Sequence, residues 1–197
     1  MFGMIFDGRN AHPSDRVQRA LGKEGADVET FRVVALIAAT IAMGLMAGVF
    51  ALYSNTIMPG LGRAGDRTFV GGFQALDKAI ENPLFLIVGF LGALVLTGLA
   101  GLLHLSGDWR SVLPWLIAAF VLYLAAFVVT IGVHLPLNAI IKKAGDPDRI
   151  TDLAAVRERF DEARWVAWNL VRVVASLAAF GCLTWALVLH GRVTGTG

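Results

Sequence analysis

Four long apolar runs divide the chain, and polar segments separate them. The runs cover residues 33–53, 84–105, 112–134 and 165–189, and each is close to the roughly 20 residues that a helix needs to cross the hydrocarbon core of a membrane. Within the four runs, Arg172 is the single Lys, Arg, Asp or Glu. Soluble proteins seldom bury four such runs, so the pattern predicts an all-α fold, an integral membrane four-helix bundle.

The two ends of the chain are predicted to lie outside this bundle. Residues 1–31 mix polar and charged side chains, and a short helix capped by Ser14 is expected to stop at Gly22 and Gly25. We therefore expect a weakly ordered amino-terminal arm over 1–31, a membrane domain over 32–190 and a flexible tail over 191–197.

Each of the two long connections carries a predicted amphipathic helix. In the first, apolar side chains recur at helical spacing over residues 66–81, at Phe69, Phe73, Leu76 and Ile80. In the second, a narrower apolar face predicts a helix that is capped by Thr151 and continues into the fourth span. With four spans, both connections are expected on the same side of the membrane.

Charge does not decide which side that is. The connections over 54–83 and 135–164 carry nine Lys and Arg, and the segments on the opposite side carry seven. Positive residues mark the cytoplasmic side only when the bias is clear. The five Lys and Arg before residue 33 favour a protein of the cell membrane with its termini in the cytoplasm.

Composition supports a membrane protein and excludes some functions. The chain has 197 residues, of which 56% are hydrophobic and 16% are charged, whereas soluble domains carry about 25% charged residues. A net charge of +2 without a basic, aromatic-rich run argues against nucleic-acid binding. The single cysteine, Cys182, forms no metal-binding spacing with histidine, and no cofactor is predicted. Rows of small residues such as Gly44 and Gly48 favour packing within the bundle and leave the oligomeric state open.

Arg172 is the residue that composition does not explain. It lies roughly 10 Å along the helix from Trp165, a residue type that commonly marks the lipid–water boundary. A charge at mid-bilayer costs about 2.5–3.5 kcal/mol, so such residues usually face the bundle interior and have a partner. Asn169 and Ser176 share its helical face. Snorkelling of Arg172 to lipid phosphate is the alternative.

Other polar residues gather at the same membrane face. The first span ends with Asn55 nearby, the third ends with His134 and Asn138, and the fourth begins with Trp165. This arrangement predicts a cleft that is apolar inside and polar at its mouth, suited to a flat hydrophobic molecule with a few oxygens. His134 fits a boundary histidine equally well, and Trp165 and Trp168 fit interfacial anchors. The opposite rim offers His104, His190 and Asp108, which have the pattern of ordinary boundary residues.

Several segments resemble the anthrone oxygenase-like family of small four-helix membrane proteins. The matching segments are 54–61 (SNTIMPGL), 69–77 (FVGGFQALD), 82–85 (NPLF), 135–138 (LPLN) and 165–172 (WVAWNLVR). The resemblance implies an oxygenase that converts anthrones to anthraquinones, without an established metal or flavin motif. Two positions differ from the family pattern, because His134 and Asp77 stand where asparagine is expected.

These observations lead to two hypotheses. In the first, the protein is an oxidoreductase that oxidises a lipophilic aromatic with dioxygen, with His134 as the base and Arg172 stabilising the resulting anion. Substrate-binding residues would be Asn55, Gln74, Asp77, Asn138, Trp165, Trp168 and Asn169. In the second, the protein is non-catalytic and binds a lipid or hydrophobic ligand, or supports a partner complex. The sequence gives only a weak signal for a metal held by His134 with Asp77 or Glu81. A proton-coupled transporter would need acidic residues within its spans, and the four spans lack them.

Overall fold

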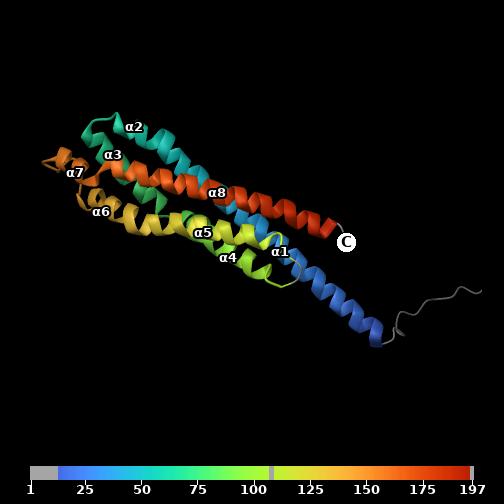
Figure 1. Cartoon of the computed structure of the whole chain (residues 1–197). Helices are drawn as coiled ribbons and strands as arrows, with labels where there is room; N and C mark the ends of the chain where they lie inside the picture. The colour runs from blue at the N-terminus through green and yellow to red at the C-terminus, as the bar shows by residue number, and fades with distance from the viewer. Residues whose placement is uncertain (1–12, 107–108, 196–197) are drawn as a thin grey trace, which may run out of the picture.

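The computed structural model describes residues 13–106 and 109–195, and within these ranges the chain is helical with no strand. Figure 1 shows long helices lying side by side in an elongated bundle. The α-helices are α1 (Pro13–Leu52), α2 (Met58–Gly62), α3 (Asp66–Ile80), α4 (Gly92–Leu103), α5 (Leu113–Val129), α6 (Leu135–Lys143), α7 (Leu153–Phe160) and α8 (Glu162–Gly195). Three π-helical segments, Tyr53–Ile57, Leu84–Leu91 and Thr130–His134, adjoin the ends of α1, α4 and α5.

Four of the helical stretches are long and apolar enough to cross a membrane, as the sequence predicts. They are Arg16–Gly62, Leu84–Leu103, Leu113–Lys143 and Leu153–Gly195. Their outward faces carry exposed large apolar side chains such as Leu45, Val121 and Val174. Apolar side chains on the outside suit a protein whose surroundings are lipid, so the four-helix membrane bundle is confirmed.

Small residues let the four helices approach closely. The core between α1, α4, α5 and α8 contains many fully buried alanines, among them Ala39, Ala93 and Ala119. A Cβ added at Gly44 would lie 2.9 Å from the Phe180 ring of α8, so this glycine serves packing within the chain. Close approach of backbones supplies the van der Waals contact that holds helices together where lipid removes the hydrophobic drive.

The two long connections meet at one end of the bundle, as expected. Helix α3 packs against α6 and α7, and the three helices gather at the left of Figure 1. Phe69 and Phe73 of α3 form an aromatic cluster with Phe160 and Trp165. The predicted amphipathic helix over 66–81 is therefore confirmed, with its apolar face buried against the other connection.

Three local expectations differ from the structure. Helix α1 runs unbroken from Pro13 through Gly22 and Gly25, so the described part of the expected arm is helical. Residues 1–12 lie outside the described residues. Helix α7 does not continue into the fourth span, because Asp161 takes a left-handed conformation with φ of 55°. Asp152, rather than Thr151, caps α7 by accepting a hydrogen bond from the Ala155 amide.

Each π-helical segment has a proline beside it. Pro59 and Pro136 each lie two residues after a π-helical segment, and Pro83 directly precedes the third. Proline lacks the amide hydrogen of a regular helical turn, and the freed carbonyl favours a locally wider turn. Single π turns inside helices frequently lie at functional sites, so these three segments indicate a candidate site.

Gly92 allows one of these wide turns to form. A Cβ at this position would lie 3.0 Å from the Ile87 carbonyl oxygen, a backbone atom that has little room to move. We expect Gly92→Ala to lower the thermal stability of the purified protein, because the Leu84–Leu91 segment must shift. Gly101→Ala on the same helix is the matched control, since a Cβ there meets nothing within 4 Å. Equal melting temperatures for the two variants would contradict this view of the π-helical segment.

Candidate functional site

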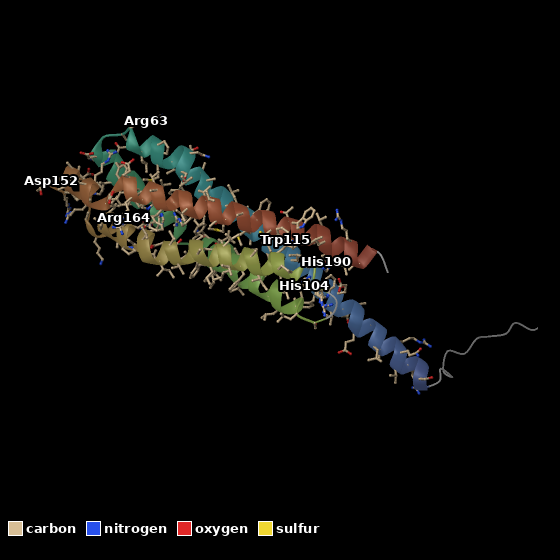
Figure 2. All side chains as sticks on the ribbon, viewed as in Figure 1. Arg63, His104, Trp115, Asp152, Arg164 and His190 are labelled. Atoms are coloured by element: carbon tan, nitrogen blue, oxygen red, sulfur yellow. The ribbon has the colours of Figure 1, made fainter. Side chains whose placement is uncertain are left out.

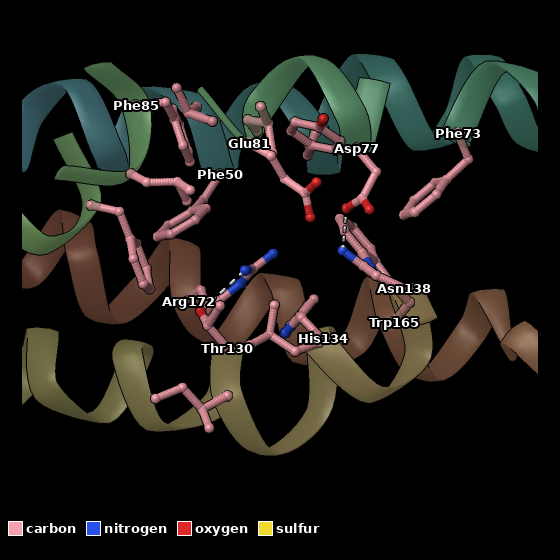
Figure 3. A pocket seen from close by; sticks show the side chains of 17 residues that line it. Phe50, Phe73, Asp77, Glu81, Phe85, Thr130, His134, Asn138, Trp165 and Arg172 are labelled. Atoms are coloured by element: carbon pink, nitrogen blue, oxygen red, sulfur yellow. Dashed lines mark hydrogen bonds between the residues drawn. The ribbon is translucent and has the colours of Figure 1, made fainter. Parts of the chain in front are cut away.

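A cavity of about 330 Å³ lies between the helices where the three π-helical segments meet. Its volume is at the lower end of the roughly 300–1,000 Å³ that ligand pockets usually have. Figure 3 shows side chains from opposite walls pointing toward the same space. The wall is largely apolar and contains the aromatic residues Phe50, Tyr53, Phe73, Phe85, Phe90 and Trp165. Its polar groups come from Asp77, Glu81, Thr130, His134, Asn138 and Arg172.

Arg172 lies inside the bundle and lines this cavity. Its side chain is 6% exposed, which excludes snorkelling to the surface. One terminal nitrogen donates to Asn169 Oδ1 at 2.6 Å and the other donates to Thr130 Oγ1 at 3.2 Å. The guanidinium also lies over the Phe50 ring, 4.4 Å from its centroid. Its Nε atom is buried and has no hydrogen-bond partner in the described structure.

Asn169 holds Arg172 in place and anchors it to the first span. Its amide nitrogen donates to the Phe50 carbonyl oxygen at 2.9 Å and to Ser54 Oγ at 2.6 Å. Its amide oxygen is therefore left to accept from Arg172. Ser176, predicted on the same helical face, is fully buried, and its hydroxyl has no partner in the described structure.

His134 is the second buried polar group on the wall. Its ring packs edge-on against Trp165, with centroids 4.9 Å apart. Nδ1 makes a long contact of 3.5 Å with the Val129 carbonyl oxygen, and a carbonyl can only accept, so this contact favours a proton on Nδ1. Nε2 then carries the lone pair. This atom is buried and has no partner in the described structure.

A hydrogen-bonded chain of three side chains crosses the polar end of the cavity. Trp165 Nε1 donates to Asn138 Oδ1 at 2.9 Å, and Asn138 Nδ2 donates to Asp77 Oδ1 at 2.8 Å. Burial raises the pKa of Asp77, opposed by the Asn138 hydrogen bond and by Lys142, while Glu81 adds to the rise. Lys142 forms an ion pair with Glu81 and lies 4.0 Å from Asp77. The two carboxylates thus have partners from α6.

The structure does not bring every predicted site residue to the cavity. Asp77, His134, Asn138, Trp165 and Arg172 line it, and Asn169 supports Arg172 from behind. The other three are absent from the lining. Trp168 is 40% exposed, and Asn55 is exposed with its Oδ1 accepting from Thr56. Gln74 instead connects α3 to the second long connection, because its Nε2 donates hydrogen bonds to the carbonyl oxygens of Ile141 and Gly145.

The aromatic part of the wall was missed by sequence reasoning. Phe50, Phe85 and Phe90 read as ordinary span residues, because apolar side chains inside an apolar run carry no distinctive pattern. A proline beside each π-helical segment is the signal that could have located them. No group of three or more His, Cys, Asp or Glu comes together as metal ligands within residues 13–106 and 109–195.

Comparison with known proteins identifies the family. The sequence profile described as anthrone oxygenase matches residues 84–182, just over half of the chain. The chain belongs to the anthrone oxygenase family. Neither the curated proteins nor the solved structures include a chain that matches this one significantly. The matched region contains His134, Asn138, Trp165 and Arg172, and the predicted family segments at 54–61 and 69–77 lie outside it.

Asn169 is expected to be essential for the position of Arg172 in this family member. Asn169→Leu removes the acceptor of Arg172 and the donor to Phe50 and Ser54, leaving polar groups unsatisfied in the core. We expect a loss of about 1–3 kcal/mol in unfolding free energy, measured by reversible denaturation in detergent. Trp168→Leu is the control at the neighbouring outward position. A loss of stability as large in the control would contradict the role given to Asn169.

Asp77 is expected to make stability depend on pH. Because its pKa in the folded protein is raised above the usual 3.8, its charged form costs stability at pH values above the folded pKa. The cost disappears as the pH falls through the folded pKa toward 3.8. Asp77→Asn keeps the shape of the side chain and avoids the charge. We therefore expect the variant to have a higher melting temperature than the parent at pH 7, and the two melting temperatures to become equal near pH 4. Asp27→Asn, at an exposed position of α1, should show no such convergence.

Proposed function

We propose that this member of the anthrone oxygenase family is a membrane-embedded oxidoreductase that oxidises a lipophilic aromatic small molecule with dioxygen. The observation that carries the proposal is a pair of buried nitrogen atoms without protein partners, His134 Nε2 and Arg172 Nε, on residues that line an apolar cavity. Buried polar atoms are normally hydrogen-bonded, so two such atoms on one wall fit a ligand that carries a polar oxygen.

The aromatic wall supports a flat ligand. Phe50, Phe85 and Phe90 offer ring surfaces, while the polar groups are concentrated toward the connections. A fused aromatic ketone would place its rings against these side chains and its oxygen near Arg172. In a mainly apolar pocket, a few well-placed polar groups usually fix the orientation of the ligand and determine which ligand binds.

Proton removal is the step proposed for His134. A neutral imidazole with a free Nε2 can accept an acidic ring proton, and the ring anion that results is electron-rich. Arg172 is already cationic and would stabilise the negative charge on the ligand oxygen without moving. The anion then reduces dioxygen. For an anthrone, the overall change is anthrone and O₂ to anthraquinone and water.

The position of the cavity suits a ligand that dissolves in lipid. Leu135 and Ile131 line the cavity and are also 54% and 52% exposed, on the outer face of the bundle. The Leu84–Leu91 segment across the cavity packs on α1 and α4. We propose that the ligand reaches the site laterally from the hydrocarbon layer, so that the lipid bilayer is both the surroundings and the source of the substrate.

We further propose that the protein resides in the cell membrane with its termini in the cytoplasm. The five Lys and Arg before residue 33 support this orientation. The cavity end of the bundle, with both long connections, would then face away from the cytoplasm.

Turnover of anthrone by the purified protein in detergent tests the proposed reaction. We expect oxygen consumption and anthraquinone formation, a loss of about 10²–10⁴-fold in His134→Ala because the base is removed, and a loss of about 10²–10³-fold in Arg172→Ala because the anion is no longer stabilised. Trp168→Ala and Asn55→Ala, outside the cavity lining, should keep parent activity.

The variants must retain the fold for this comparison to hold, so each is checked by size-exclusion elution and melting temperature. Parent-level turnover in both His134→Ala and Arg172→Ala would overturn the mechanism. A parent protein that consumes no oxygen but retains co-purified lipid, lost in Arg172→Ala, would establish the non-catalytic lipid-binding alternative.

A further inference from the structure

An open hollow on the outside of the bundle lies between α6 and α7, and none of its lining residues belongs to the cavity. Figure 2 shows charged side chains gathered at this end of the bundle, where Arg63, Asp152 and Arg164 are labelled. The hollow measures about 330 Å³ and is lined by Pro136, Ala139, Ile140, Lys143, Ala144 and Arg159. It therefore combines an apolar floor with two cations.

The two cations of the hollow have no acidic partner in the protein. Lys143 and Arg159 are both exposed, and neither forms an ion pair within the described residues. The adjacent Lys142, by contrast, pairs with Glu81. Arg159 Nε donates to the Ala155 carbonyl oxygen at 3.3 Å, which orients the side chain and leaves its two terminal nitrogens unused. Both cations are therefore available to an anion from outside the chain.

The carboxylates on the neighbouring surface have other partners. Asp146 and Asp152 line an adjoining hollow together with Arg159. Asp146 pairs with Arg149 at 3.6 Å, and Asp152 caps α7 by accepting from the Ala155 amide. The hollow between α6 and α7 is itself lined by no Asp or Glu, so its local charge is positive.

The hollow lies at the level of the lipid headgroups. The third apolar run ends at His134 and α6 continues the same helical stretch, so Pro136 and Lys143 lie roughly 3 Å and 14 Å farther along the axis. A headgroup layer is about 5–7 Å thick. Side chains lean toward the N-terminus of their helix, which for α6 is toward the bilayer, and a lysine stem extends this reach. Trp168 is 40% exposed one turn beyond Trp165, which packs on His134, and an outward tryptophan at this level is typical of the membrane boundary.

We propose that this hollow binds one anionic phospholipid from the leaflet that the two long connections face. The phosphate lies between Lys143 and Arg159, and an acyl chain follows the floor at Pro136 toward Gly132 and Val128, which are exposed on the same helical stretch. A free phosphate ion would use the two cations but not the apolar floor. The combination of the two therefore favours a lipid.

Charge decides which phospholipid fits. A zwitterionic headgroup carries its own cation beside the phosphate, and Lys143 and Arg159 repel that cation. An anionic headgroup such as phosphatidylglycerol carries only the charge of the phosphate. Basic pockets between helices at a membrane surface bind anionic headgroups in this way. The site is separate from the cavity and independent of the oxidation proposed there.

Native mass spectrometry of the full chain tests the proposal. The protein is released from detergent micelles that contain equimolar phosphatidylglycerol and phosphatidylcholine with the same acyl chains. We expect one retained phosphatidylglycerol, preferred on the order of 30-fold, because each cation favours an anionic headgroup about fivefold. The double variant Lys143→Gln/Arg159→Gln should retain the two lipids about equally. Arg159→Lys, which keeps the charge, should keep most of the preference.

Arg63→Gln/Lys78→Gln is the matched control, because it removes two exposed cations of the first connection that lie outside the hollow. It should keep the parent preference, and equal melting temperatures show that all variants retain the fold. A parent without preference, a preference that survives in Lys143→Gln/Arg159→Gln, or an equal loss in the control would each overturn the proposal. Displacement of the lipid by millimolar inorganic phosphate would overturn it in favour of a free-anion site. None of these outcomes depends on oxygen consumption, so the proposed oxidation is tested separately.

Discussion

The structure depends on one interaction, the burial of a guanidinium among four apolar helices. A charge at mid-bilayer costs about 2.5–3.5 kcal/mol, and hydrogen bonds to a charged group contribute about 1.5–3 kcal/mol each. Two such bonds and an aromatic face are therefore enough to hold Arg172 in the interior. The bonds come from different spans, since Thr130 belongs to the third and Asn169 to the fourth, while Asn169 is itself bound to the Phe50 carbonyl of the first. The hydrogen bonds that hold the charge in the interior therefore also fix the relative positions of these three spans.

The same helices must also leave space beside that charge. A regular helix packed against three neighbours tends to fill its interface, and the core away from the cavity does so with alanines and glycines. Around the cavity, three spans change to wider π turns, which move side chains out of the regular register. Proline and Gly92 make those turns possible at fixed places. The cavity therefore follows from backbone features, and the aromatic side chains then shape its wall.

Sequence reasoning recovered the parts of the molecule that depend on composition and periodicity. Four apolar runs predict four spans because soluble proteins seldom bury so many, and Arg172 stands out because a charge inside such a run has few explanations. The spacing of Asn169 and Arg172 places both on one face without any knowledge of packing. The resemblance to the anthrone oxygenase family, noted from short segments, is confirmed by the profile match over 84–182.

What the sequence could not supply depends on contacts between distant segments. Trp165 and Trp168 look equivalent in the sequence, yet one donates to Asn138 inside the bundle and the other is 40% exposed, and only the rotation of α8 decides between them. His104 and His190 are 86 positions apart, so their hydrogen bond leaves no local pattern. The break at Asp161 is similar, because a left-handed residue is needed there only once α7 must fold back onto α3.

Buried polar atoms without a hydrogen-bond partner lie at both ends of the bundle. At the remote end, His104 contacts the Ala100 carbonyl oxygen and His190, while Glu29 Oε1 is buried without a hydrogen-bond partner in the described structure. At the cavity end, Arg172 and His134 each keep one buried nitrogen without a protein partner. An unsatisfied buried atom costs about 1–3 kcal/mol. What distinguishes the cavity end is that two such atoms, His134 Nε2 and Arg172 Nε, belong to residues that line one apolar cavity, and this convergence supports the proposal that a ligand binds there.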